Sequence, residues 1–160
     1  MGWNPENYAH EEDFRSTAVL RDDDILVPIQ DSAAAIEPGH VALLTGMPLA
    51  DLQTLAATGK MQALRFFGCW GPAFEQDGGI RLFELLNEHA SELLGVYMPT
   101  TNFTDEAVQR FEDPQLLPKL RVFEAINVPV SESAVGTLMQ KRPDVIWRFG
   151  PRHLIRWVEA

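Results

Sequence analysis

The C-terminal stretch of residues 145–158 constrains the fold more than any other part of this chain, because large apolar side chains occupy both alternating sets of its positions. Residues 145–149 and 154–158 each fit a short strand, and residues 150–153 fit the loop of a β-hairpin. The cross-strand pairs predicted by this register are Phe149 with Leu154, Trp147 with Arg156, and Ile146 with Trp157. Neither face of the ribbon is polar, so each must be covered by the rest of the chain or by a partner.

The rest of the sequence contains more helix signals than strand signals. The expected strands are 25–30, where Pro28 favours an edge position, and 120–126; the apolar segment 40–45 fits either a strand or a helix. The expected helices are 48–59 with Gly59 as its cap, 60–70, 80–97 with a wide apolar stripe, one that begins at Thr104, and 131–142 before Pro143. We find no internal repeat.

The predicted fold class is therefore α+β: a single helix-rich domain with a small sheet and a C-terminal β-hairpin. With 46% apolar and 22% charged residues, the chain has a globular composition, and its 160 residues suit one domain. Residues 25–160 are predicted to form that domain. Residues 1–24 are polar without a clear period, which predicts an acidic, loosely ordered arm.

The charge of the chain is acidic and unevenly distributed. There are 13 Lys and Arg residues against 23 Asp and Glu residues, a formal net charge of −10. Residues 1–37 hold nine acids and two bases, whereas residues 140–160 hold five bases and two acids. Such a field disfavours nucleic acid and anionic membranes and favours a protein partner with a basic surface.

No targeting or membrane segment is recognisable in the sequence. Residues 1–9 lack the basic and then apolar plan of a secretory signal. The longest uncharged apolar stretch, 41–50, contains Gly46 and Pro48 and is far shorter than the ~20 residues of a spanning helix. We therefore expect a soluble, cytoplasmic protein without membrane contact.

Cys69 is the only cysteine, which excludes an intrachain disulfide and a paired-cysteine redox or metal site. It is also the candidate nucleophile of an alternative function, a cysteine-dependent hydrolase or transferase, with His89 and His153 as candidate bases. Its apolar neighbours favour a buried, inert thiol instead. No acid and histidine spacing predicts a metal site, and we expect no cofactor.

A third alternative is a DNA-binding regulator of the helix-turn-helix type. Ala42, Gly46, Leu52 and Leu55 have the spacing of that unit, and 49–58 would be its recognition helix. That helix carries no arginine, and the domain lacks the positive charge that supplies most of the affinity for DNA.

The leading hypothesis is a non-catalytic accessory or regulatory protein, such as an adaptor, an inhibitor or an immunity-like protein, that binds another protein. It combines the acidic charge with the aromatic C-terminal segment, whose candidate binding residues are Trp147, Arg148, Arg156 and Trp157. A homo-oligomer is compatible with the same surface.

Overall fold

The computed structural model describes residues 26–29, 41–69, 77, 79–99, 103–126 and 130–150. Strands and helices alternate along the chain and form a six-stranded sheet in which the spatial order of the strands equals their order in the sequence. The elements are β1 (Leu26–Ile29), β2 (Ala42–Thr45), α2 (Leu49–Ala57), β3 (Phe66–Cys69), α3 (Ile80–His89), β4 (Gly95–Pro99), α4 (Asp105–Arg110), β5 (Val122–Ile126), α5 (Glu132–Lys141) and β6 (Ile146–Gly150).

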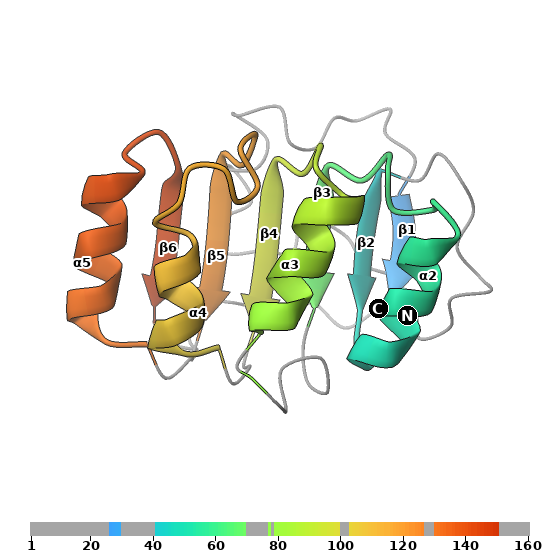
Figure 1. The fold of residues 1–160 in the computed structure, drawn as a ribbon, viewed down its shortest axis with the longest axis horizontal. Coiled ribbons are helices and arrows are strands. Elements are labelled where there is room, and N and C mark those ends of the chain that lie inside the picture. Colours follow the sequence, from blue (N-terminus) through green and yellow to red (C-terminus); the bar gives the residue numbers. More distant parts are fainter. Residues whose placement is uncertain are drawn as a thin grey trace.

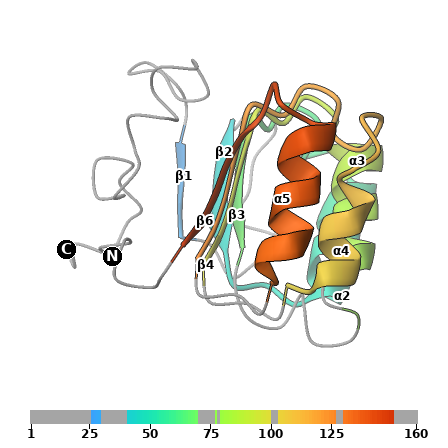
Figure 2. The same ribbon diagram turned by 90° about the vertical axis from the view of Figure 1, so that its left-hand side faces the viewer.

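The architecture is a repeating strand–helix unit. All neighbouring strands are parallel, and α2 to α5 lie on one face of the sheet (Figures 1 and 2). Strands β2 to β6 begin at residues 42, 66, 95, 122 and 146, which are 24, 29, 27 and 24 residues apart. Units of this length, each stacked on the next one in the chain, define a β/α solenoid.

The strand register stacks equivalent positions of successive units into columns that face the helices. Pairing aligns one such column across the sheet, composed of Leu43, Phe67, Val96, Phe123 and Trp147. All members of this column are buried in the hydrophobic core. Because the side-chain period of a strand is two, the intervening residues form columns on the opposite face.

Aromatic rings fill the core between the sheet and the helices α3 and α4. The Phe83 ring lies 4.6 Å from that of Phe111 and 5.2 Å from that of Phe103, measured between centroids. The Phe123 ring of β5 lies 5.1 Å from Phe111 and 5.4 Å from Trp147 of β6. Edge-to-face and tilted contacts of this kind stabilise a core beyond the burial of area alone.

Several local signals in the sequence are confirmed. The Thr104 hydroxyl accepts a hydrogen bond from the Ala107 N–H at 3.3 Å, and the Ser131 hydroxyl accepts one from Ala134 at 3.2 Å. Both residues therefore cap helices that begin where the sequence predicts them. Gly59 follows α2 with a φ of 77°, the left-handed conformation typical of a residue after a helix end. Strand β1 occupies the edge of the sheet, as Pro28 suggested.

The predicted fold class is wrong. The structure is α/β with an all-parallel sheet, not α+β with a C-terminal hairpin. Residues 146–150 do form a strand, but it pairs in parallel with β5; residues 154–158, the predicted second arm, lie outside the described residues. Apolar side chains on both faces, which predicted a two-sided hairpin, are also what a parallel sheet buried on both faces requires.

Two helix predictions are also corrected. The segment 60–70, expected to be helical, contains a turn and then β3. The long helix expected over 80–97 ends at His89, and β4 begins at Gly95. Leu93 and Tyr97 match the helical period of the residues before them, yet the Leu94 N–H donates to the Arg65 carbonyl at 2.8 Å, so this segment joins the sheet. The acidic arm at 1–24 lies outside the described residues.

Candidate functional site

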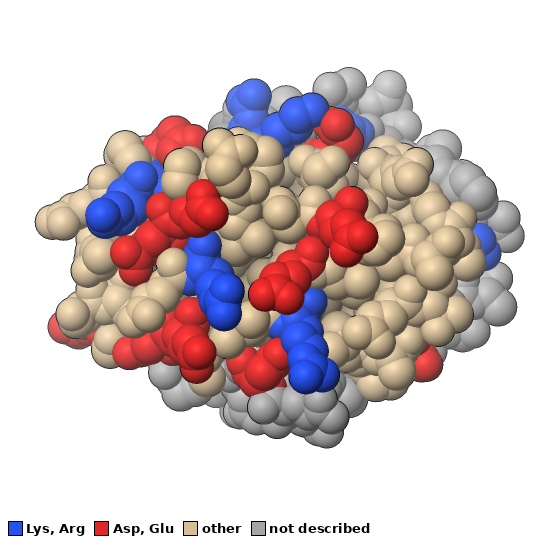
Figure 3. Space-filling view, in the orientation of Figure 1, with Lys and Arg blue, Asp and Glu red and all other residues tan. Residues whose placement is uncertain are grey.

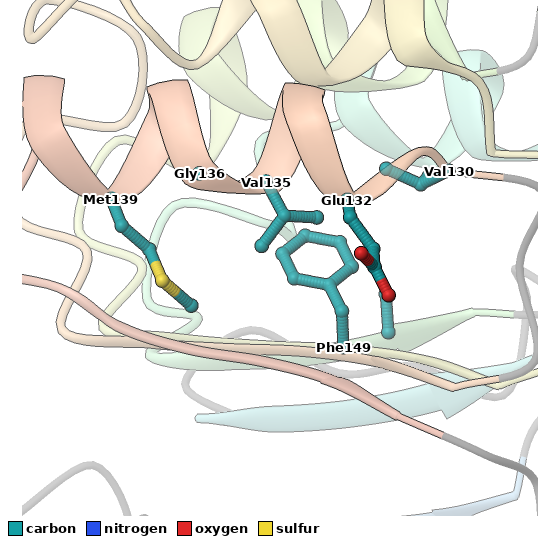
Figure 4. Close-up of a pocket in the computed structure, with 7 residues that line it drawn as sticks. Val130, Glu132, Val135, Gly136, Met139 and Phe149 are labelled. Carbon is teal, nitrogen blue, oxygen red and sulfur yellow. The ribbon is translucent and has the colours of Figure 1, made fainter.

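An apolar groove lies between α5 and the last strands of the sheet. Its volume is about 360 Å³, and it is lined by Ala125, Val130, Glu132, Val135, Gly136, Met139 and Phe149. Figure 4 shows the Val135 and Met139 side chains directed from α5 toward the sheet, with the Phe149 ring below Val135. The groove is thus a hollow between the helix layer and the strand layer.

Helical periodicity explains how α5 forms one wall of this groove. Glu132, Val135, Gly136 and Met139 are spaced i, i+3, i+4 and i+7, so they share one stripe of the helix. Leu138 is buried and anchors the neighbouring stripe to the core. Met139 is 44% exposed, and no other large hydrophobic side chain in the described part of the chain is exposed. The groove therefore offers apolar surface to solvent.

The outer edge of β6 forms the rim of the groove. The Ile146 N–H donates to the Arg121 carbonyl of the adjoining strand segment at 2.7 Å. Because backbone groups alternate in direction along a strand, the N–H and C=O groups of Trp147 and Phe149 are directed away from β5. No strand in the described ranges pairs with this side of β6. An open edge of this kind is a template for a further strand.

A buried arginine holds α5 and β6 in place. The Arg142 guanidinium donates to the carbonyl oxygens of Leu116 at 2.7 Å, Leu117 at 3.0 Å and Phe111 at 3.4 Å. In turn the Trp147 indole N–H donates to the Arg142 carbonyl at 3.1 Å. Desolvation lowers the pKa of Arg142, while the carboxylates of Asp144 and Asp113 act in the opposite direction. This cluster fixes the position of the groove's walls relative to the preceding unit.

The groove carries an acid at one end and a base beyond the other. Glu132 lies in the first turn of α5, and Lys141 lies in its last turn; both side chains are exposed. Glu132 has no ion pair with any residue that the structure describes. The Glu132 side chain points toward the sheet beside Phe149 (Figure 4). The end of the groove next to the C-terminal end of β6 is therefore acidic.

The rest of the helix face has mixed charge. Figure 3 shows acidic and basic side chains interspersed over α3 and α4. Between these two helices, the charged groups of Glu84 and Arg110 are 3.8 Å apart. Most of the net charge of −10 comes from residues 1–37, of which only 26–29 are described. The helix layer is thus not a uniformly acidic surface.

The structure does not bring Cys69 and His89, two residues of the predicted cysteine enzyme, together. Cys69 is fully buried at the C-terminal end of β3. His89 lies at the C-terminal end of α3, which runs back toward the opposite end of the sheet (Figure 1), and its imidazole is 3.7 Å from the Glu88 carboxylate. His153 lies outside the described residues. Since a thiol must reach its substrate, the position of Cys69 does not favour catalysis.

The helix-turn-helix unit is not formed either. Its first helix would include Ala42, but residues 42–45 are β2 in the sheet. The expected recognition helix exists as α2, with Leu52 and Leu55 buried against the core. Only one of the two helices needed for this motif is present.

The predicted binding residues are divided between environments. Trp147 is buried on the helix side of β6, with 6% exposure, whereas its neighbour Arg148 is exposed on the other face. Arg156 and Trp157 lie outside the described residues. Within the described part of the molecule, the Trp–Arg pair therefore does not form one patch, and Arg148 is the member that reaches solvent.

A polar row on the face of the sheet opposite α2 to α5 was missed by the sequence reasoning. The register aligns Tyr97 of β4 with Glu124 of β5 and Arg148 of β6. Tyr97 and Glu124 are fully buried, and burial, followed by the negative charge of Glu124, raises the pKa of the Tyr97 phenol far above its usual value. The phenol therefore stays protonated. The alignment comes from the parallel register of β4, β5 and β6, which no local pattern in the sequence indicates.

The described residues form neither a metal site nor a membrane-spanning helix. In the part of the chain that is described, no group of three or more His, Cys, Asp or Glu side chains is arranged to hold a metal ion. Among the described helices, none combines the length and apolar character needed to cross a bilayer.

Comparison with known proteins gives no family assignment. No family model matches the sequence, and no curated protein or solved structure shows significant similarity to it. The protein can therefore be classified by its architecture alone, as a β/α solenoid with a groove at one end.

Proposed function

We propose that this protein is a non-catalytic, protein-binding accessory or regulatory protein, in the manner of an adaptor, an inhibitor or an immunity protein, and that it binds its partner at the groove between α5 and β6. The observation that carries the proposal is the exposed apolar lining of this groove. Met139 is 44% exposed, and Val135 and Phe149 are half-buried. The strand residues in register with Phe149, Ala125 of β5 and Met98 of β4, are fully buried. Apolar surface left open in this way is typical of interaction sites.

Charge supports the choice of partner. The chain has a net charge of −10, and the acidic end of the groove is formed by Glu132. A partner with a basic surface is attracted by the overall field and meets an opposite charge at the groove itself. The proposed compartment is the cytoplasm, where a lone cysteine is kept reduced.

The experiment compares Met139→Glu with a matched control, Gln53→Glu, which makes an exposed acidic side chain on α2 at a distance from the groove. Both positions are exposed, so neither substitution disturbs the core. The partner is captured from the native cell, identified by mass spectrometry, purified, and its binding to each variant measured by calorimetry.

We expect Met139→Glu to weaken binding of the purified partner by about tenfold or more, because a carboxylate would lie in the apolar groove. Gln53→Glu should bind like the parent protein. Equal affinities for the two variants would refute the groove as the binding site. If no captured protein binds the parent chain once purified, the protein-binding function itself is refuted.

A further inference from the structure

We propose, building on the protein-binding function above, that the groove is a strand-accepting site: one extended segment of the partner adds to the outer edge of β6, parallel to it, and inserts alternate apolar side chains beneath α5.

The space at the end of the sheet suits a single strand. Figure 1 shows α5 lying further out than β6, so the helix layer extends beyond the last strand. Strands in a sheet are separated by about 4.8 Å, and an added strand would therefore lie in the space under α5. The groove found there, of about 360 Å³, has room for side chains but is open along its side.

Phe149 is less buried than the residues of the inner strands with which it is in register. On the helix side of the sheet, Met98 of β4 is in register with Ala125 of β5, which is in register with Phe149 of β6. Met98 and Ala125 are fully buried, each with a strand on both sides, but Phe149 is only half-buried. A seventh strand, supplied by the partner, would give Phe149 the neighbour that the inner members of its column already have.

The backbone of β6 is positioned for this pairing. The Ile146 N–H points inward, to the Arg121 carbonyl, so the peptide groups of Trp147 and Phe149 point outward. An incoming parallel strand can bond to these groups and continue the ladder. Main-chain hydrogen bonds supply affinity in such strand addition, and pockets for alternate side chains supply specificity.

The lining of the groove defines the chemistry of the segment. Val135 and Met139 form an apolar roof, which suits valine, isoleucine or leucine at alternate positions of the strand. Glu132 lies at the end where β6 terminates, so a parallel segment would place a lysine or arginine there, at its C-terminal end.

The test uses two synthetic peptides of identical composition, in which valine alternates with threonine and the last residue is lysine. In the first peptide, alternate residues are N-methylated so that the methyl groups lie on the edge of the peptide that faces away from β6. The edge of the peptide that faces β6 therefore keeps its N–H groups. The other is N-methylated on the complementary set, which removes those donors. Binding is followed by amide hydrogen exchange of the full chain, read at each residue of β6 by NMR.

We expect only the first peptide to bind, and to slow exchange at Trp147 and Phe149 by about tenfold or more, because their N–H groups then bond to the added strand. A version of this peptide that ends in glutamate should bind more weakly. Three results would overturn the strand mode: equal binding of the two methylated peptides, binding without slower exchange at Trp147 and Phe149, or slow exchange at both residues before any peptide is added.

Blocking the groove provides a second measurement. A Cβ atom at Gly136 would meet nothing within 4 Å, so Gly136→Leu can project into the groove without a clash. Thr137→Leu is the matched control, because Thr137 is exposed on the adjacent side of α5. Gly136→Leu should abolish binding of the first peptide, and Thr137→Leu should not. If the peptides fail but the purified partner still distinguishes Met139→Glu from Gln53→Glu, the strand mode is refuted and the protein-binding function stands.

Discussion

The inner units of the solenoid and its last unit have the same plan but different surroundings. In β3, β4 and β5, the core residues that face the helices are fully buried, because a strand lies on each side. In the last unit Phe149 and Val135 are half-buried, and Met139 is exposed. The difference teaches that burial in this fold depends on the next unit along the sheet more than on the residue itself, as expected of a nearly one-dimensional stack.

The largest expected effect comes from removing an aromatic ring from an inner unit. Phe123 of β5 contacts the rings of Phe103, Phe111, Trp147 and Phe149 at centroid distances of 5.1–5.8 Å. Phe123→Ala should lower the free energy of unfolding by about 3–5 kcal/mol, because it leaves a cavity in the core. Phe149→Ala, at the half-buried end, should lower it by only about 1 kcal/mol.

Urea denaturation of the two variants measures this contrast directly. Losses of equal size would show that the last unit is packed as tightly as the inner ones. In that case the open groove between α5 and β6 would not be a feature of the protein in solution.

The next effect concerns the contact that joins the last unit to the one before it. Arg142→Met replaces arginine with an unbranched apolar side chain. It removes the guanidinium group, which donates to three carbonyl groups between Phe111 and Leu117. We expect a loss of about 3 kcal/mol, because buried hydrogen bonds from a charged donor contribute more than neutral ones.

Arg142→Lys is the control for charge, since it keeps the positive charge but lacks the planar fork that reaches several carbonyls. Its thermal unfolding temperature should lie between those of the parent and Arg142→Met. If both variants unfold like the parent protein, Arg142 does not hold the last unit in place.

Local features of this fold were predictable from the sequence, whereas pairing between strands was not. The helix starts at Thr104 and Ser131 could be predicted because each cap is a local interaction. The hydroxyl of each residue bonds to a backbone N–H only three residues away. The parallel register of Phe123 with Trp147 joins residues 24 positions apart, and no short-range pattern encodes it. The hairpin prediction failed for this reason: it used the nearest apolar segment as the partner of β6.

The candidate site depends on the same long-range information. Met139 lies in the helix predicted over 131–142, and an apolar residue on a helix is normally expected to be buried. Its exposure follows from its place at the end of the sheet, next to β6, which only the strand order reveals. The same applies to Gly136, whose open surroundings cannot be deduced from its neighbours in the sequence.

The smallest expected effect is a difference in stability change between two glycine substitutions, one at Gly136 in the last unit and one at Gly59 after α2. Gly136 lies inside α5 and faces open space, so Gly136→Ala should stabilise the protein by about 0.5–1 kcal/mol, because alanine loses less backbone entropy in a helix. Gly59, after α2, has a φ of 77°, and Gly59→Ala should destabilise the protein by about 1 kcal/mol through backbone strain. The midpoints of chemical denaturation should therefore shift in opposite directions. If Gly136→Ala also destabilised the chain, the space beside α5 would be filled in solution, and the last unit would differ from the inner ones less than the structure indicates.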